Sequence, residues 1–339
     1  MATQSIPSID FSASNGSDET ALADLVDQIR AACQSHGFFQ LTNHGIPQSS
    51  MDAVLECSKE FFALPLEEKE KYDLNLTKDY RGYERLRAQN FENRVQGDLK
   101  EGYYFGLDLP KDHPSVLAKK FSLGPNKYPK QVKDPQGFQD RIDSYFNEML
   151  EMAQRIFRLL CKTLDVDDEW LSEYFNTPIA TLRLLHYPPQ PPSASELERG
   201  IGAHTDFGAV TILLQDMVGG LQVWDRESSR WMDVVPTKGA FVVNLGNLMM
   251  RWTNDRYISN LHRVINKSGQ ERYSVPFFFS GNPDFLVKCF PNCQDPKAGA
   301  KYPPTTVEEW LAGRYAATYG TSGTKAAEDL SQDKAAALA

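Results

Sequence analysis

Hydrophobic side chains in the first half of the chain recur at the spacing of amphipathic helices. Between residues 18 and 35, Leu22, Leu25 and Ile29 fall on one helical face, and a second helix is predicted over residues 48–64. The longest apolar stripe follows Pro135 and contains Phe138, Ile142, Tyr145, Met149, Met152, Ile156, Leu159 and Leu160. A helix with an apolar stripe of this length is expected to pack against a sheet.

Two short apolar runs in the same half predict strands, and a polar stretch between the helices predicts a surface loop. The runs cover residues 6–11 and 36–47, and turn-forming residues end the second. The stretch 72–96 has few periodic apolar positions and carries three arginines, Arg81, Arg85 and Arg87. Because long loops of this kind often cover functional sites, we expect a lid here, with its arginines facing solvent.

From Thr177 onward, the pattern changes to short β-branched and aromatic runs, broken at Gly, Pro, Asn and Asp, with one last helix near residues 306–319. This close spacing favours antiparallel sheets over alternating βαβ units. We therefore predict an α+β fold: a double-stranded β-helix (jelly-roll) core, supported by helices mainly from the N-terminal half. The predicted organisation is a mixed α/β region over 1–120, the long helix and jelly-roll core over 121–319, and a disordered tail over 320–339.

The charge and composition of the chain narrow the classes of partner. Its 339 residues include 36 Lys and Arg against 45 Asp and Glu, a net charge of −9, which argues against nucleic acid and anionic membranes. No apolar run approaches the roughly 20 residues of a membrane helix, and the N-terminus lacks the features of a secretory signal. We expect a cytoplasmic protein that acts on a small molecule, with five reduced cysteines and an oligomeric state that the sequence leaves open.

Three residues of the β-rich half form a candidate metal site. His204 and Asp206 are two positions apart, so in an extended segment their side chains point to the same side. His262 follows in the strand-like run ISNLHRVI. Two histidines and one carboxylate leave half of an octahedral shell open, which is typical of non-haem Fe(II) oxygenases. A structural zinc site would require a fourth protein ligand.

A second pair of residues predicts an anion site close by. Arg272 and Ser274 lie ten and twelve residues after His262 and share one face of a predicted strand. A guanidinium group and a hydroxyl group inside a barrel suit a ligand carboxylate, which the arginine can bind in a bidentate manner. An unpaired buried arginine is otherwise costly, so Arg272 is expected to meet an anion.

These motifs lie within longer blocks, and over roughly residues 5–320 the chain resembles the isopenicillin N synthase-like family of 2-oxoglutarate/Fe(II)-dependent dioxygenases. The blocks include HGFFQLTNHGIP, DLKEGYYFG, LRLLHYPP, HTDFGAVTILLQD, GGLQV, VVNLGNLM, RWTND, LHRV and RYSVPFF. The sequences of these blocks are most similar to those of fungal members of the family, which include thymine 7-hydroxylase and natural-product oxygenases.

The resemblance implies a role for each motif residue. His204, Asp206 and His262 match the iron ligands of the family, and Arg272, Ser274 and Tyr187 match the residues that hold the distal carboxylate of 2-oxoglutarate. Two departures occur: the plant-type Asn-Tyr-Tyr-Pro run is LHYP here, and the usual Gly-Asp after the VVN strand is Gly-Asn. Neither departure changes an implied iron ligand.

The resemblance also implies Fe(II) as cofactor, with 2-oxoglutarate and O2 as cosubstrates, and oxidation of a C–H bond with release of succinate and CO2. Hydroxylation, desaturation, ring formation and ring expansion are all open outcomes. The expected setting is natural-product biosynthesis, with a thymine-like nucleobase hydroxylase as an alternative. Because the R-x-S pair serves the substrate in isopenicillin N synthase, a 2-oxoglutarate-independent Fe(II) oxidase stays open, as does a jelly roll that only binds metal and ligand.

Four residues are candidates for contact with the substrate. Arg183 shares a strand face with Tyr187 and is predicted to bind an anionic or carbonyl-bearing substrate, with a salt bridge at the barrel rim as the alternative. Phe207, Phe279 and Tyr103 are predicted to form an aromatic wall, with ordinary core packing as the alternative. Such a pocket would suit a planar nucleobase, an aromatic natural product or a small amino-acid derivative.

Overall fold

The main sheet of the protein joins strands from both ends of the chain. The computed structural model describes residues 5–77, 79–92, 97–191, 193 and 198–319. Apart from the parallel pair β1–β2, neighbouring strands of the main sheet are antiparallel. Their order is β1 (Ser8–Asp10), β2 (Phe38–Thr42), β10 (Phe241–Leu245), β7 (Val210–Gln215), β12 (Arg272–Gly281), β5 (Ile179–Tyr187), β4 (Glu101–Gly106) and β3 (Gly82–Glu84).

A second, smaller sheet packs against the main sheet and completes the predicted double-stranded β-helix. It is antiparallel, in the order β6 (Ile201–His204), β11 (His262–Val264), β8 (Leu221–Asp225) and β9 (Arg230–Asp233). Side chains of both sheets form one hydrophobic cluster, in which Leu185 and Val242 of the main sheet meet Val223 and Val264 of the smaller one. The two sheets therefore enclose an interior between them, as in jelly-roll proteins.

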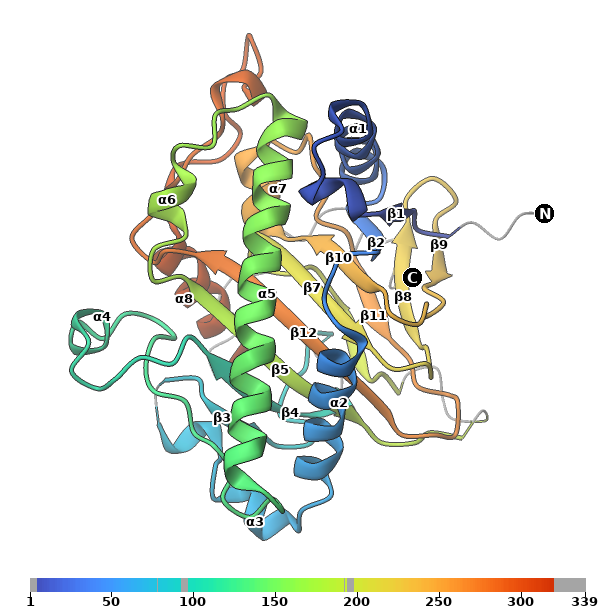
Figure 1. Ribbon diagram of the computed structural model, residues 1–339, viewed down its shortest axis with the longest axis vertical. Helices are drawn as coiled ribbons and strands as arrows, with labels where there is room; N and C mark the ends of the chain where they lie inside the picture. Colours follow the sequence, from blue (N-terminus) through green and yellow to red (C-terminus); the bar gives the residue numbers. More distant parts are fainter. Residues whose placement is uncertain (1–4, 78, 93–96, 192, 194–197, 320–339) are drawn as a thin grey trace.

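Helices cover the other face of the main sheet, as the apolar stripes predict. In Figure 1 the long helix α5 (Pro135–Leu164) crosses this face with α2 (Gln48–Phe62) beside it. Helix α5 starts with Asp134, whose side chain accepts a hydrogen bond from the backbone N–H of Gly137, and with Pro135 in the first turn. Its predicted stripe is buried from Phe138 to Leu160, and Leu164 in the last turn is buried as well.

The remaining helices of the described chain are α1 and α8, near its two ends, and four short helices of six residues or fewer between them. The helices are α1 (Glu19–Ser35), α3 (Leu66–Glu70), α4 (Pro114–Leu117), α6 (Leu171–Tyr174), α7 (Asn247–Trp252) and α8 (Val307–Tyr319). The 3₁₀ turns are η1 (Ser12–Asn15), η2 (Leu74–Leu76) and η3 (Pro291–Cys293), and a two-stranded ribbon joins β13 (Leu286–Val287) to β14 (Thr305–Thr306).

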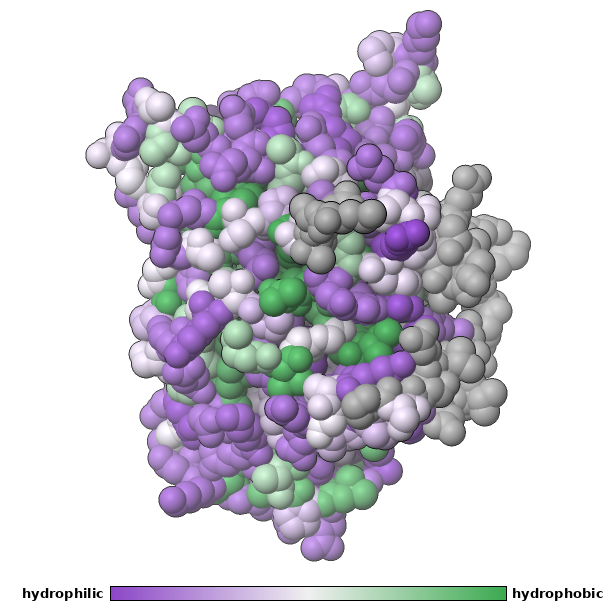
Figure 2. Space-filling model, turned by 90° about the vertical axis from the view of Figure 1, so that its right-hand side faces the viewer, coloured by the Kyte–Doolittle hydropathy of each residue, from purple (hydrophilic) through white to green (hydrophobic). Residues whose placement is uncertain are grey.

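No helix in the described part of the chain is both long and apolar enough to cross a membrane. On the face shown in Figure 2, hydrophobic side chains appear in small groups among hydrophilic ones.

The stretch 72–96 differs from the predicted surface loop. Its middle forms β3, which pairs with β4 at the edge of the main sheet, and Arg81 directly before β3 is completely buried. Arg85 and Arg87 do lie toward the surface, where they form ion pairs. The polar composition of this segment predicts exposure to solvent, but some of its charged side chains can be buried because they have partners inside the protein. Glu84, for example, forms an ion pair with the buried Lys100. Residues 78 and 93–96, like the predicted tail at 320–339, lie outside the described residues.

Candidate metal and cosubstrate site

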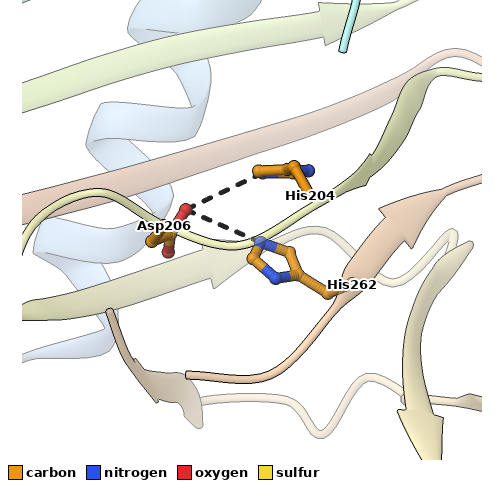
Figure 3. Close-up of side chains that lie close together, drawn as sticks. All are labelled: His204, Asp206 and His262. Atoms are coloured by element: carbon orange, nitrogen blue, oxygen red, sulfur yellow. Dashed lines mark ion pairs between the residues drawn. The ribbon is translucent and has the colours of Figure 1, made fainter. Parts of the chain in front are cut away.

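Strand pairing in the smaller sheet brings the three candidate metal ligands together. His204 is the last residue of β6, His262 is the first of β11, and the two are directly opposite each other in the antiparallel pair. Asp206 lies in the loop after β6, and its Oδ1 is 3.7 Å from Nε2 of each histidine. Figure 3 shows the carboxylate and both imidazoles converging on one point.

Hydrogen bonds fix the orientation of all three side chains. Nδ1 of His204 lies 2.9 Å from the carbonyl oxygen of Gly202, and Nδ1 of His262 lies 3.2 Å from that of Asn260. Since a carbonyl oxygen can only accept, each Nδ1 carries the proton and each Nε2 keeps a lone pair for a metal. Phe91 stacks on the ring of His204, with ring centroids 4.3 Å apart.

The Asp206 carboxylate is held in its ionised form. Its Oδ2 accepts hydrogen bonds from the Thr211 hydroxyl at 2.5 Å and from the Asn244 amide at 2.7 Å, so Oδ1 stays directed at the histidines. Burial alone would raise the pKa of this carboxyl, but on balance it is lowered, by the charge of the two histidines whenever they are protonated and by these two hydrogen bonds, which act in either state of the histidines.

This donor set fits ferrous iron. The three ligand atoms lie within 4.8 Å of one another, and among the described residues this is the one cluster of three or more His, Cys, Asp or Glu side chains with such spacing. Two imidazoles and a carboxylate on one side leave several coordination positions for other ligands. A closed structural zinc site would need a fourth protein ligand, which this cluster does not supply.

Arg272, Ser274 and Tyr187 form a buried cradle in the interior between the two sheets. Arg272 and Tyr187 are paired across β12 and β5, and the guanidinium carbon lies 4.7 Å from the centroid of the tyrosine ring. The guanidinium group donates to the backbone oxygen of Gly219 at 2.6 Å, to Gln215 Oε1 at 3.2 Å and to Ser274 Oγ at 3.3 Å.

The cradle fits a carboxylate ligand. Arg272 is 0% exposed, and within the described part of the chain no carboxylate pairs with it. Burial raises the pKa of Tyr187, although the nearby Arg272 partly offsets this effect, so the phenol keeps its proton and can donate. A buried cation beside two hydroxyl groups is the arrangement that a dicarboxylate such as 2-oxoglutarate would complete.

The metal cluster and the cradle open into one pocket, which Arg183 and Phe207 also line. Arg183 lies between the rings of Tyr104 and Phe278, at 4.3 and 4.7 Å from their centroids. Its Nη2 donates to the hydroxyl of Tyr315 at 2.8 Å, so α8 contributes to the pocket wall.

Phe279 and Tyr103 do not line this pocket, contrary to the predicted aromatic wall. Both are completely buried on the helix-covered side of the main sheet, Phe279 against Phe157 and Tyr103 against Phe61. Successive residues of a strand point to opposite faces, so an error of one position moves a side chain from the pocket to the core. Phe278, the neighbour of Phe279, lines the pocket instead.

Because Phe278 faces the pocket and Phe279 faces the core, substitutions at these two neighbouring positions should change the free energy of unfolding by different amounts. Phe279→Leu should lower the free energy of unfolding by about 1–2 kcal/mol, because it leaves a gap in a packed core. Phe278→Leu should lower it by less than half as much, because Phe278 is only partly buried. Denaturant unfolding of both variants measures the difference, and equal losses would contradict the assignment.

Several other residues line the pocket, although no local sequence pattern identifies them as pocket residues. They come from segments far apart in the chain and include Phe38, Gln89, Phe91, Phe121, Ser122, Leu311 and Tyr315. Phe278 is different: it lies four positions after Ser274 on β12, so alternation from the R-x-S pair identifies it.

Comparison with known proteins shows that this chain is similar to a large group of oxygenases. Residues 178–281 match a family model described as the 2OG-Fe(II) oxygenase superfamily, and residues 6–131 match one described as the N-terminal region of a non-haem dioxygenase in morphine synthesis. The chain is 50% identical over 321 residues to a 2-oxoglutarate-Fe(II) type oxidoreductase of Emericella nidulans, and the match covers 94% of this chain and 92% of the relative.

Two further relatives carry more specific descriptions. A clavatol oxidase of Penicillium crustosum is 37% identical, with coverage of 88% of this chain and 92% of the oxidase. The crystal structure of a full-length Neurospora crassa protein in complex with alpha-KG and thymine superimposes with a TM-score of 0.80 at 28% identity. That superposition covers 92% of this chain and 96% of the Neurospora crassa chain.

Proposed function

The chain belongs to the 2OG-Fe(II) oxygenase superfamily, and from this membership we propose which residues carry the reaction and what kind of molecule is oxidised. The protein is a 2-oxoglutarate- and Fe(II)-dependent oxygenase with a double-stranded β-helix core. When bound, Fe(II) together with 2-oxoglutarate and O2 supplies the oxidation of a substrate C–H bond, with release of succinate and CO2.

The observation that carries the assignment is the convergence of His204, Asp206 and His262 beside a buried arginine with no carboxylate partner among the described residues. We assign these three side chains to Fe(II) and assign Arg272, Ser274 and Tyr187 to the distal carboxylate of 2-oxoglutarate. Arg272 and the hydroxyl of Tyr187 orient that carboxylate, while the Thr211 and Asn244 hydrogen bonds keep Asp206 ionised and directed at the metal.

The substrate is proposed to be a small molecule with a flat, unsaturated ring. Phe91, Phe121, Phe207 and Phe278 line the part of the pocket outside the cradle, and aromatic walls of this kind favour planar ligands. Arg183 is proposed to contact a polar group of the substrate. Relatives such as the clavatol oxidase support oxidation of a fungal natural product, while the thymine-bound Neurospora crassa structure supports a nucleobase as the second candidate.

A single assay tests the proposed dependence on both cosubstrates. The purified protein, supplied with Fe(II), O2 and isotopically labelled 2-oxoglutarate, should release labelled succinate, and the release should stop when Fe(II) is chelated. Candidate substrates should accelerate it. Metal-dependent oxidation of a substrate that runs fully without any 2-oxo acid would contradict the assignment of the cradle to 2-oxoglutarate.

A further inference from the structure

Arg81 is a completely buried cation placed against the pocket. It precedes β3, and its guanidinium group occupies the space over Gly106, where an added Cβ would lie 1.8 Å from Nη2. Gly106 pairs with Thr181, which lines the pocket six residues before Tyr187 on the same face of β5. Arg81 thus lies at the end of the pocket opposite the Arg272 cradle.

The contacts of Arg81 are directed mainly at a single residue, Ser122. Its Nη1 donates to Ser122 Oγ at 3.0 Å, and its Nη2 donates to the Ser122 backbone oxygen at 2.6 Å. Within the described part of the chain, Arg81 forms no ion pair with a carboxylate, and its Nε has no hydrogen-bond partner. Burial lowers the pKa of Arg81 to about 10, so the group still carries its charge at neutral pH.

Ser122 has an uncommon backbone conformation and a hydroxyl group that can donate a hydrogen bond into the pocket. Its backbone is left-handed, with φ of 56°, which is uncommon for a residue with a side chain. Because Oγ accepts the hydrogen bond from Arg81, its own proton is free to donate, and the structure provides no acceptor for it among the described residues. Ser122 lines the pocket, so that donor is available to a ligand.

One further cation lies at this end. Arg183 lines the pocket and donates to the hydroxyl of Tyr315, which also lies close enough to Arg81 to raise its pKa. Glu84 interacts electrostatically with Arg183 and is also bound by Lys100. Asp206 is the one acidic residue among the described residues that line the pocket, and it belongs to the metal site. The pocket lining around Ser122 therefore presents the cation Arg183 and no carboxylate among the described residues, while Asp79 and Asp108 act on Arg81 from outside the lining.

We propose that this end of the pocket is an anion subsite and that the substrate is a ring-bearing organic carboxylate. Its carboxylate accepts hydrogen bonds from the Ser122 hydroxyl and the Arg183 guanidinium group, while Arg81 is a positioning residue that holds Ser122 and polarises its hydroxyl. The inference rests on the proposed function, because it assumes that the cradle of Arg272 is occupied by 2-oxoglutarate.

Direct binding measurements with matched probes test this subsite. Calorimetric titrations under anaerobic conditions use protein loaded with Fe(II) and saturating 2-oxoglutarate, so that the probes cannot bind at Arg272. The probes are 4-methylbenzoate, its neutral counterpart 4-methylbenzamide, and thymine. The wild-type protein should bind the benzoate about tenfold more tightly than the amide or thymine, as expected for charge-assisted hydrogen bonds.

Substitutions of Ser122 separate its hydroxyl group from its backbone. Ser122→Ala removes the hydroxyl, and Ser122→Gly removes it while relieving the left-handed backbone. Both should reduce the affinity for 4-methylbenzoate about tenfold and that for the amide less than about threefold. The matched control is Ser280→Ala, which removes another buried serine hydroxyl of the same pocket and should leave the benzoate-to-amide ratio as in the wild type.

Three outcomes would overturn the anion subsite: equal or tighter binding of a neutral probe, an unchanged benzoate-to-amide ratio in both Ser122 variants, or no binding of the benzoate. A separate titration of Fe(II)-loaded protein with 2-oxoglutarate distinguishes these results from failure of the proposed function. If 2-oxoglutarate binds but the probe series fails, only the subsite is wrong; if 2-oxoglutarate does not bind, the proposed function is wrong.

Discussion

Asp206→Asn is expected to abolish Fe(II)-dependent succinate formation and to weaken Fe(II) binding by more than about 100-fold. The substitution keeps the shape of the side chain but removes the one negative charge of the donor set. In the wild type, Oδ1 of Asp206 lies 3.7 Å from Nε2 of His204 and from Nε2 of His262. Loss of the hydrogen-bonding partners of metal ligands alone typically costs about 10–100-fold, so the loss of a ligand should exceed that range. Equilibrium titration of Fe(II), together with the succinate assay, measures both effects.

Asn244→Ala provides the matched comparison for this substitution. It leaves all three ligands in place and removes the amide that donates to Asp206 Oδ2. We expect it to weaken Fe(II) binding by about 10–100-fold, which is less than the effect of Asp206→Asn. Wild-type Fe(II) affinity in the Asp206 variant would show that the metal binds elsewhere.

Arg272→Met should raise the KM for 2-oxoglutarate by about 10²–10³-fold, since removal of one partner of a buried charge pair costs about 2–5 kcal/mol. Without 2-oxoglutarate, the variant should unfold at the wild-type temperature or above it. An arginine that is 0% exposed and has no carboxylate partner among the described residues disfavours the empty protein, and methionine fills similar space without charge. The variant should also lose the stabilisation that 2-oxoglutarate gives the wild type, about 2.7 kcal/mol at 100 times Kd.

Thermal unfolding with and without 2-oxoglutarate separates these two effects of Arg272→Met. Arg272→Lys is the control, because it keeps the charge and loses the bidentate geometry, and it should fall between the wild type and the methionine variant. A methionine variant that still gains full stabilisation from 2-oxoglutarate would exclude Arg272 from the cosubstrate site.

Local periodicity, helical in the first half of the chain and alternating in the strands, explains why much of the architecture and of the central site could be predicted from the sequence. The long stripe of α5, the change to short β runs after Thr177 and the spacing of the H-x-D and R-x-S pairs are local patterns, and each constrains which side chains share a face. The pairing of His204 with His262 then follows from the closure of the smaller sheet.

The rest of the pocket could not be predicted because it depends on contacts between distant segments. Tyr315 meets Arg183 across 132 positions of sequence, and Ser122 meets Arg81 across 41. A polar segment usually faces solvent, yet Ser122 supplies partners for Arg81 inside the protein. The prediction of Phe279 instead of Phe278 is a different kind of error, because it is wrong by one position on a strand. Side chains alternate along β12, so counting from Ser274 would have assigned Phe278 to the pocket.

The most direct test of the account is the position of iron in crystals of the protein grown without oxygen and supplied with Fe(II) and 2-oxoglutarate. Anomalous diffraction at the iron absorption edge should give a single peak within bonding distance of Nε2 of His204, Nε2 of His262 and Oδ1 of Asp206. The density of 2-oxoglutarate should join that peak to Arg272. A peak at another place, or none at these three atoms while the protein retains its Fe(II)-dependent activity, would contradict the account.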